Sequence, residues 1–317
     1  MNLFLPSSFA MLFTSVFLPS PALSASTQVI PSKCQSNRVQ LQILGSRGPE
    51  LLDDQASTGY LIWLDNKARV IVDAGAGSLQ RFKQSKASFE DVDLFLFSHF
   101  HVDHSSDFPA YIKGAFFTKR SKPLFVYGPT GTKFVASAEQ FVERAIGSEA
   151  GMYPYLGNVL DNEARGAYKI KVANIEWSYS DLTIKTIYNK NNIRVKTVST
   201  HHGPFPSQGY RVELAGCSIT FSGDMSGRLG AMPEFAKNTD IFVAHNAIPE
   251  DATGVAALLH MTPTTIGKIA KRANVKNLLL THLMARSINL EAETLRLIKN
   301  NYHGAVSFPN DLDRFKP

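Results

Sequence analysis

The chain of 317 residues is poor in cysteine and in charged side chains, and no run of like charge occurs in it. Charged residues make up 19% of the sequence and the formal net charge of +6 is spread along it, so no basic cluster marks a nucleic-acid surface. No segment repeats at a fixed period, which sets repeat architectures aside. The hydrophobic content of 44% is sufficient for a sizeable core.

Residues 1–25 contain no Asp, Glu, Lys or Arg. They include the apolar stretch Phe9–Leu18, followed by Pro19 and a segment of small residues. This pattern resembles a secretory signal peptide without a basic residue ahead of its apolar stretch, and the stretch is too short to span a bilayer. We expect residues 1–25 to be a signal peptide, with a plain apolar tail as the alternative. Residues 26–317 are then expected to form a single domain in a periplasmic or secreted protein.

The two cysteines, Cys34 and Cys217, allow one disulfide in an exported protein. The sequence does not show that they lie close together. Two buried free thiols are an equally good interpretation.

Short apolar runs that suit buried strands alternate with amphipathic segments that suit helices. Strands are predicted at 39–44, 58–64, 68–72, 93–97, 123–127, 193–200, 209–214, 218–222, 240–244 and 277–281, and helices at 78–85, 133–145 and 264–273. The segment 147–168 lacks periodicity and is interpreted as an irregular insertion. The interleaving predicts an α/β protein.

The most specific motif is Ser98-His99-Phe-His101-Val-Asp103-His104, directly after the apolar run that ends at Phe97. Imidazole and carboxylate are the ligands that zinc takes at hydrolytic sites, and one loop can present several of them to a cation. Surface histidines placed by chance are the much weaker interpretation of so dense a pattern.

One loop cannot fill two coordination spheres, and polar residues follow other predicted strands. His202, Asp224 and His282 each come just after an apolar run. Any one of them alone is more often a loop-lining or capping residue. Because ligands of layered α/β folds collect at strand ends, we expect the three to join the first motif.

With these residues the chain resembles the metallo-β-lactamase superfamily. His99, His101, Asp103 and His104 match its signature, Asp73-Ala-Gly75 resembles an earlier strand end, and His202, Asp224 and His282 fall in the order of its remaining ligands. The resemblance implies a four-layer αββα sandwich with a site at one edge between the sheets. It also implies two divalent metal ions, with zinc preferred and Mn²⁺ or Fe²⁺ as alternatives.

The resemblance assigns one metal to His99, His101 and His202, the other to Asp103, His104 and His282, and a bridging position to Asp224. A hydroxide between the metals would be the nucleophile. Asp73 is expected to hold the metal loop through hydrogen bonds. His201 and His202 compete for one ligand position, and the following Gly203–Arg211 segment favours His202.

Five histidines and two aspartates resemble the phosphodiesterase, ribonuclease Z and arylsulfatase members rather than the antibiotic-degrading ones. His260-Met-Thr-Pro263 resembles the ribonuclease Z segment whose histidine protonates the leaving group, so Asp103 and His260 are the expected catalytic residues. A role for His260 as a residue at a helix start is the alternative. His245 precedes Asn246 where ribonuclease Z has a glutamate, and it is expected to support a ligand.

Residues after Gly128 contain no basic arm of the kind that ribonuclease Z uses to hold tRNA, so nucleic acid is not expected as a partner. The segments at His202 and Thr281–Ser287 resemble arylsulfatase-like enzymes. We therefore expect a metal-dependent hydrolase of small-molecule sulfate or phosphate esters, with aryl sulfate as the leading substrate, no membrane association and a homodimer as the common oligomeric state. The alternatives are a phosphodiesterase or ribonuclease Z-like endonuclease, and a metal-binding protein without catalysis.

Overall fold

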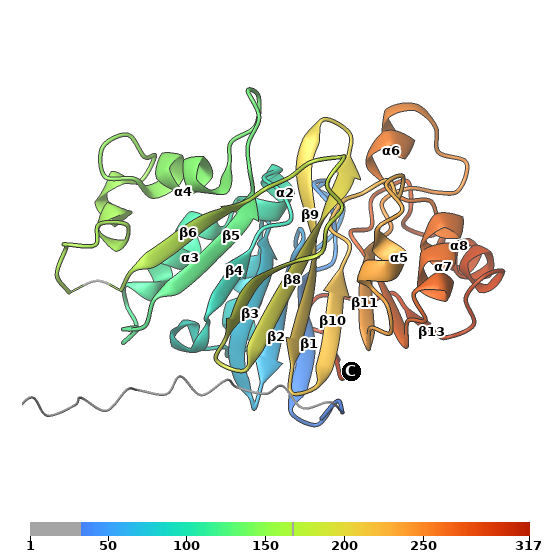
Figure 1. Ribbon diagram of the computed structural model, residues 1–317, viewed down its shortest axis with the longest axis horizontal. Helices are drawn as coiled ribbons and strands as arrows, with labels where there is room; N and C mark the ends of the chain where they lie inside the picture. Colours follow the sequence, from blue (N-terminus) through green and yellow to red (C-terminus); the bar gives the residue numbers. More distant parts are fainter. Residues whose placement is uncertain (1–32, 167) are drawn as a thin grey trace, which may run out of the picture.

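The computed structural model describes residues 33–166 and 168–317, which form two sheets packed face to face with helices on both outer sides (Figure 1). This arrangement is the predicted αββα sandwich. The predicted signal peptide lies outside the described residues. Within the described part, no helix has the length and hydropathy needed to cross a bilayer.

The first sheet has seven strands in the order β14-β1-β2-β3-β4-β5-β6. Its strands are β1 (Val39–Gly45), β2 (Gly59–Leu64), β3 (Lys67–Ala74), β4 (Leu94–Leu96), β5 (Leu124–Pro129), β6 (Ile170–Ile175) and β14 (Arg314–Phe315). Pairing is antiparallel from β14 to β3 and parallel from β3 to β6. The parallel strands β3 and β4 therefore deliver their following loops to the same edge.

The second sheet also has seven strands, in the order β13-β12-β11-β10-β9-β8-β7. Its strands are β7 (Lys185–Lys190), β8 (Ile193–His202), β9 (Phe205–Leu214), β10 (Cys217–Phe221), β11 (Ile241–His245), β12 (Asn277–Thr281) and β13 (Ala305–Ser307). Strands β10 to β13 pair in parallel, whereas β7 to β10 are antiparallel. The ends of β8, β10, β11 and β12 thus meet at one edge.

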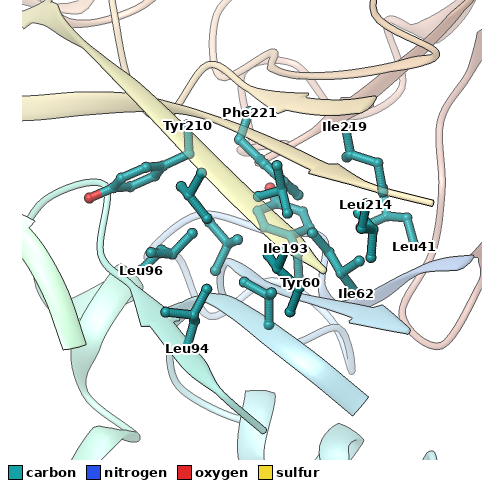
Figure 2. Packing of buried hydrophobic residues seen from close by; sticks show 14 of the residues in the cluster. Leu41, Tyr60, Ile62, Leu94, Leu96, Ile193, Tyr210, Leu214, Ile219 and Phe221 are labelled. Atoms are coloured by element: carbon teal, nitrogen blue, oxygen red, sulfur yellow. The ribbon is translucent and has the colours of Figure 1, made fainter. Parts of the chain in front are cut away.

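Successive side chains of a strand point to opposite faces of its sheet, which divides the buried apolar residues into separate clusters. In the first sheet Leu94 and Leu96 face the second sheet, where Tyr210 and Ile193 meet them (Figure 2). Phe95, between them in sequence, faces outward into a different cluster. A continuous apolar run such as 94–97 is therefore the sequence signature of a strand buried on both faces.

Helices cover each outer face. The first sheet carries α1 (Ser78–Gln84), α3 (Phe108–Ala115) and α4 (Ala138–Ile146), and the second carries α5 (Met232–Phe235), α7 (Pro263–Arg272) and α8 (Glu291–Lys299). Shorter helical segments are η1 (Phe89–Asp91), α2 (Val102–Ser105), η2 (Pro154–Val159) and α6 (Gly254–Leu259).

Helix α4 begins at Ala138, five residues after the predicted start at Lys133. Ser137 caps it, because the Ser137 side chain accepts from the Gln140 backbone while the Gln140 side chain accepts from the Ser137 backbone. A helix extended to Lys133 would lose this capping box. The amphipathic pattern predicted the helix but not its first turn.

The two cysteines form a disulfide, Cys34–Cys217, which joins the first described residues to the start of β10. The Gln35 backbone also donates to the Ala215 carbonyl. The sequence left a disulfide and two free thiols equally open, and the structure contains the disulfide.

Candidate metal centre

The loop after β4 is placed by a buried aspartate at the end of β3. Asp73 Oδ1 accepts from the Ser98 backbone at 2.7 Å, and its Oδ2 accepts from the Ser98 hydroxyl at 2.8 Å and from His104 Nδ1 at 2.9 Å. Ser98 Oγ also lies 3.1 Å from His99 Nδ1. Asp73 therefore orients both His99 and His104, as predicted for a residue that supports the loop.

Close backbone packing brings the same loop against β3. A Cβ built on Gly75 would stand 2.1 Å from the Asp103 carbonyl oxygen. Only glycine permits this approach, which is a packing reason for the Asp73-Ala-Gly75 sequence.

Two groups of side chains whose ligand atoms lie within 4.8 Å of one another meet at this edge, and Asp224 belongs to both. The first group is His99, His101, His202 and Asp224, and the second is His104, Asp224, His245 and His282. Asp103 joins them, since its Oδ2 lies 3.2 Å from His282 Nε2 and 3.5 Å from His104 Nε2. The structure thus brings together all seven residues that the sequence singled out as ligands.

Asp224 lies at the middle of the centre. Its Oδ2 is 3.6 Å from His104 Nε2 and from His202 Nε2, and 3.9 Å from His99 Nε2. Its Oδ1 is 3.4 Å from His282 Nε2. One carboxylate therefore faces ring nitrogens of both groups.

His99, His104 and His202 each contact a protein group through Nδ1 and turn Nε2 toward the interior of the centre. His202 Nδ1 donates to the Leu259 carbonyl at 2.9 Å, which turns its Nε2 toward Asp224. The inward Nε2 atoms of His99 and His104 are buried and have no hydrogen-bond partner in the described part of the chain. Buried imidazole nitrogens aimed at one another and at a carboxylate are the arrangement expected of metal ligands held by outer hydrogen bonds.

His245 differs from the other histidines. Its Nδ1 lies 2.6 Å from Asp224 Oδ1, and its Nε2 lies 2.9 Å from the Tyr60 hydroxyl, which also contacts Thr281 Oγ1. Both ring nitrogens are thus engaged by protein groups. His245 orients Asp224, in agreement with the supporting role predicted for it, and Tyr60 is a partner that no sequence pattern indicated.

His201 and His260 have different surroundings. His201 Nδ1 contacts Ser226 Oγ at 2.9 Å, and among the described residues it belongs to neither ligand group. His260, the residue after α6, is 7% exposed, and its Nδ1 lies 3.9 Å from Asp224 Oδ2 with no hydrogen-bond partner within residues 33–166 and 168–317. His260 therefore borders the centre, as a candidate proton donor should.

The electrostatics of the centre call for added positive charge. Asp73, Asp103 and Asp224 are buried, and none of them pairs with a lysine or arginine among the described residues. Burial alone lowers the pKa of His104, but Asp103, Asp224 and Asp73 outweigh it and raise that pKa well above its ordinary value. Divalent cations would neutralise these carboxylates, so the donor set fits metal ions.

Other histidines are kept neutral. Burial is the main cause that lowers the pKa of His202 to about 4 and that of His260 to about 3, and it lowers the pKa of His99 well below its ordinary value. Neutral imidazole is the form that binds a metal.

A sandwich of two sheets with a buried histidine and aspartate centre at one edge defines a class of metal-dependent hydrolases. The comparisons agree, because residues 68–283 match the family model described as the beta-lactamase superfamily domain. The chain belongs to this family.

Relatives of the chain include ribonuclease Z from Methanosarcina acetivorans, 26% identical over 68% of this chain and 78% of the relative. Among solved structures, the metallo-beta-lactamase fold protein YhfI from Bacillus subtilis has a TM-score of 0.67 at 20% identity, with 88% of this chain and 99% of that one covered. Human tRNase Z, short form, has a TM-score of 0.64 at 16% identity, with 87% and 98% covered.

These relatives correct one expectation. The prediction that nucleic acid is not a partner is wrong, because relatives of the chain are named as ribonucleases and a structural neighbour as a tRNase. The error came from treating the lack of a basic arm as decisive. The comparisons favour the alternative of a phosphodiesterase or ribonuclease Z-like enzyme over an arylsulfatase.

Proposed function

We propose that the chain hydrolyses phosphodiester bonds at a centre of two divalent metal ions, with RNA among its substrates. The observation that carries this proposal is the pair of ligand groups that share Asp224. A pair of neighbouring cations suits a displacement at phosphorus, where both the attacking and the leaving oxygen carry charge.

The geometry supports the predicted division of ligands. His99, His101 and His202 would hold one ion, Asp103, His104 and His282 the other, and Asp224 would be shared. The nitrogen-rich donor set favours zinc. When bound, the ions would supply Lewis acidity and lower the pKa of a coordinated water.

The chain's own residues supply positioning and proton transfer. Asp73 holds the His99 to His104 loop, and His245 holds Asp224. His260 stands beside the centre, and its Nδ1 has no hydrogen-bond partner among the described residues. Burial favours the neutral ring, so His260 would first have to take up a proton before it could protonate the leaving oxygen.

An exposed cation near the centre favours an anionic substrate. Arg286 is exposed and follows the ligand His282 by four residues, and its charge contributes, after burial and the neighbouring histidines, to lowering the pKa of His260. Arg286 is anchored by donation from its Nε to the Ala247 carbonyl. A guanidinium at this position suits a phosphodiester oxygen.

The test compares esters of one leaving group. Zinc-loaded protein should hydrolyse bis(4-nitrophenyl) phosphate faster than 4-nitrophenyl phosphate or 4-nitrophenyl sulfate, and it should shorten a tRNA transcript with a 3′ extension. A second measurement uses the variant Arg286→Gln, which should raise KM for the diester while its zinc content stays unchanged. Preference for the sulfate, with no cleavage of diester or RNA, would overturn the proposal.

A further inference from the structure

The metal centre is open to solvent on one side, beside His101. His101 is half-buried, whereas the other predicted ligands are buried. The exposed part of this ring offers a substrate one approach to the centre.

Phe205 lies at this opening. Its ring centroid is 4.2 Å from that of His101 at an interplanar angle of 71°, and 5.8 Å from that of His202. The register of the β8–β9 hairpin pairs Phe205 with His202, so both side chains project from the same face. The ring is half-buried and part of it faces solvent.

Other apolar side chains of the adjoining segments are also exposed or half-buried. Val102, between His101 and Asp103, is 69% exposed. At the hairpin tip, the Leu259 side chain approaches Gly203, and α6 contains no buried residue although its sequence is Gly-Val-Ala-Ala-Leu-Leu. Exposed apolar surface beside a buried polar centre is costly unless something covers it in the working complex.

We propose that Phe205 stacks against a planar aromatic group that the substrate carries next to its phosphorus. The inference rests on the proposed function and names a feature of its substrate, namely a diester with an aryl group or a nucleobase close to the scissile bond. Phe205 meets His101 edge to face, which leaves an approach for a second ring.

The experiment holds the leaving group constant and changes the retained group. The substrates are 4-nitrophenyl phenyl phosphate, thymidine 5′-(4-nitrophenyl phosphate) and methyl 4-nitrophenyl phosphate. We expect KM for at least one aromatic diester to lie about tenfold below that for the methyl diester, the effect of one stacking contact. Phe205→Leu should abolish this difference, Phe205→Tyr should retain it, and the aromatic diester with the lower KM identifies the source of the ring.

Tyr179→Leu is the matched control. Tyr179 stacks on His201 with ring centroids 4.8 Å apart, so it is an aromatic residue packed on a histidine outside the ligand groups. This variant should keep the wild-type preference. An unchanged preference in Phe205→Leu at normal zinc content would overturn the inference.

Binding without turnover separates this inference from the proposed function. Calorimetry should show phenylphosphonate binding about tenfold tighter than methylphosphonate to the zinc-loaded protein, and equally tight binding of the two to Phe205→Leu. If wild-type protein shows this difference but hydrolyses no diester, the proposed function fails and the stacking site stands. If neither protein distinguishes the two phosphonates, the stacking site is wrong.

Discussion

At the scale of single residues, the centre depends on one carboxylate with many neighbours. Asp224 faces ring nitrogens of both ligand groups and is held by His245. Its pKa illustrates the dependence, since burial alone would raise it, but His282, His260 and His104 hold it well below its ordinary value. The neighbouring histidines thus stabilise the ionised carboxylate of Asp224.

Asp224→Asn should therefore release metal from both positions and abolish turnover, because the neutral amide offers less charge to each ion. Zinc bound per chain, measured by plasma mass spectrometry after dialysis, checks this. Asp181→Asn, which removes an exposed carboxylate paired with Lys185, is the control and should keep its zinc. Normal zinc content and full activity in Asp224→Asn would refute the shared role.

The role of His260 as a general acid can be tested separately from metal binding. His260→Ala should slow diesters with poor leaving groups by about 10²–10⁴-fold, the usual range for a general acid, and should affect nitrophenyl esters far less. The measurement is kcat against leaving-group pKa for wild type and variant. Equal losses across the series would remove the general-acid role and leave His260 as a structural residue.

At the scale of secondary-structure elements, the sequence predicted the strands that carry ligands better than the connections. The runs 94–97 and 278–280 are apolar because they are buried on both faces, and this pattern is visible without a structure. Strands β6 and β7 were not predicted, because polar residues such as Lys171, Thr186 and Asn189 interrupt their apolar positions. The contacts of Tyr60 with His245 and of Phe205 with His101 join distant segments, so no local pattern reports them.

The close contact between β3 and the metal loop gives a prediction for this element. Gly75→Ala would drive a Cβ into the Asp103 carbonyl, so we expect a loss of about 1–3 kcal/mol in unfolding free energy together with weaker zinc binding. Gly114→Ala is the control, because a Cβ there meets no atom within 4 Å, and it should be neutral or stabilising by up to about 1 kcal/mol. Urea denaturation with and without zinc measures both, and indistinguishable variants would contradict the steric account.

At the scale of the whole molecule, the Cys34–Cys217 disulfide spans 183 residues of sequence. A cross-link of this span stabilises by at most about 5 kcal/mol in the chain-entropy model. We therefore expect the Cys34→Ser/Cys217→Ser variant to lose several degrees in Tm but to keep diesterase activity at low temperature, because the bond lies at the start of β10, whereas the metal residue Asp224 follows the end of that strand. An unchanged Tm would show that the bond does not form or does not constrain the unfolded chain.

The disulfide also supports the proposal that the protein is exported, since such bonds persist in oxidising compartments. Cell fractionation combined with thiol alkylation tests this. Recovery of the mature protein in the periplasm with both thiols blocked is expected, whereas cytosolic protein with two free thiols would contradict export.

The central claim is that hydrolysis of phosphodiesters requires two metal ions at the centre around Asp224. It is tested most directly by titrating zinc into chelator-treated protein while recording bound zinc per chain and the rate on bis(4-nitrophenyl) phosphate. The account predicts no turnover without metal and a rate that reaches its maximum only as the second ion binds. Full activity in the metal-free protein, or with no second ion bound at saturation, would contradict it.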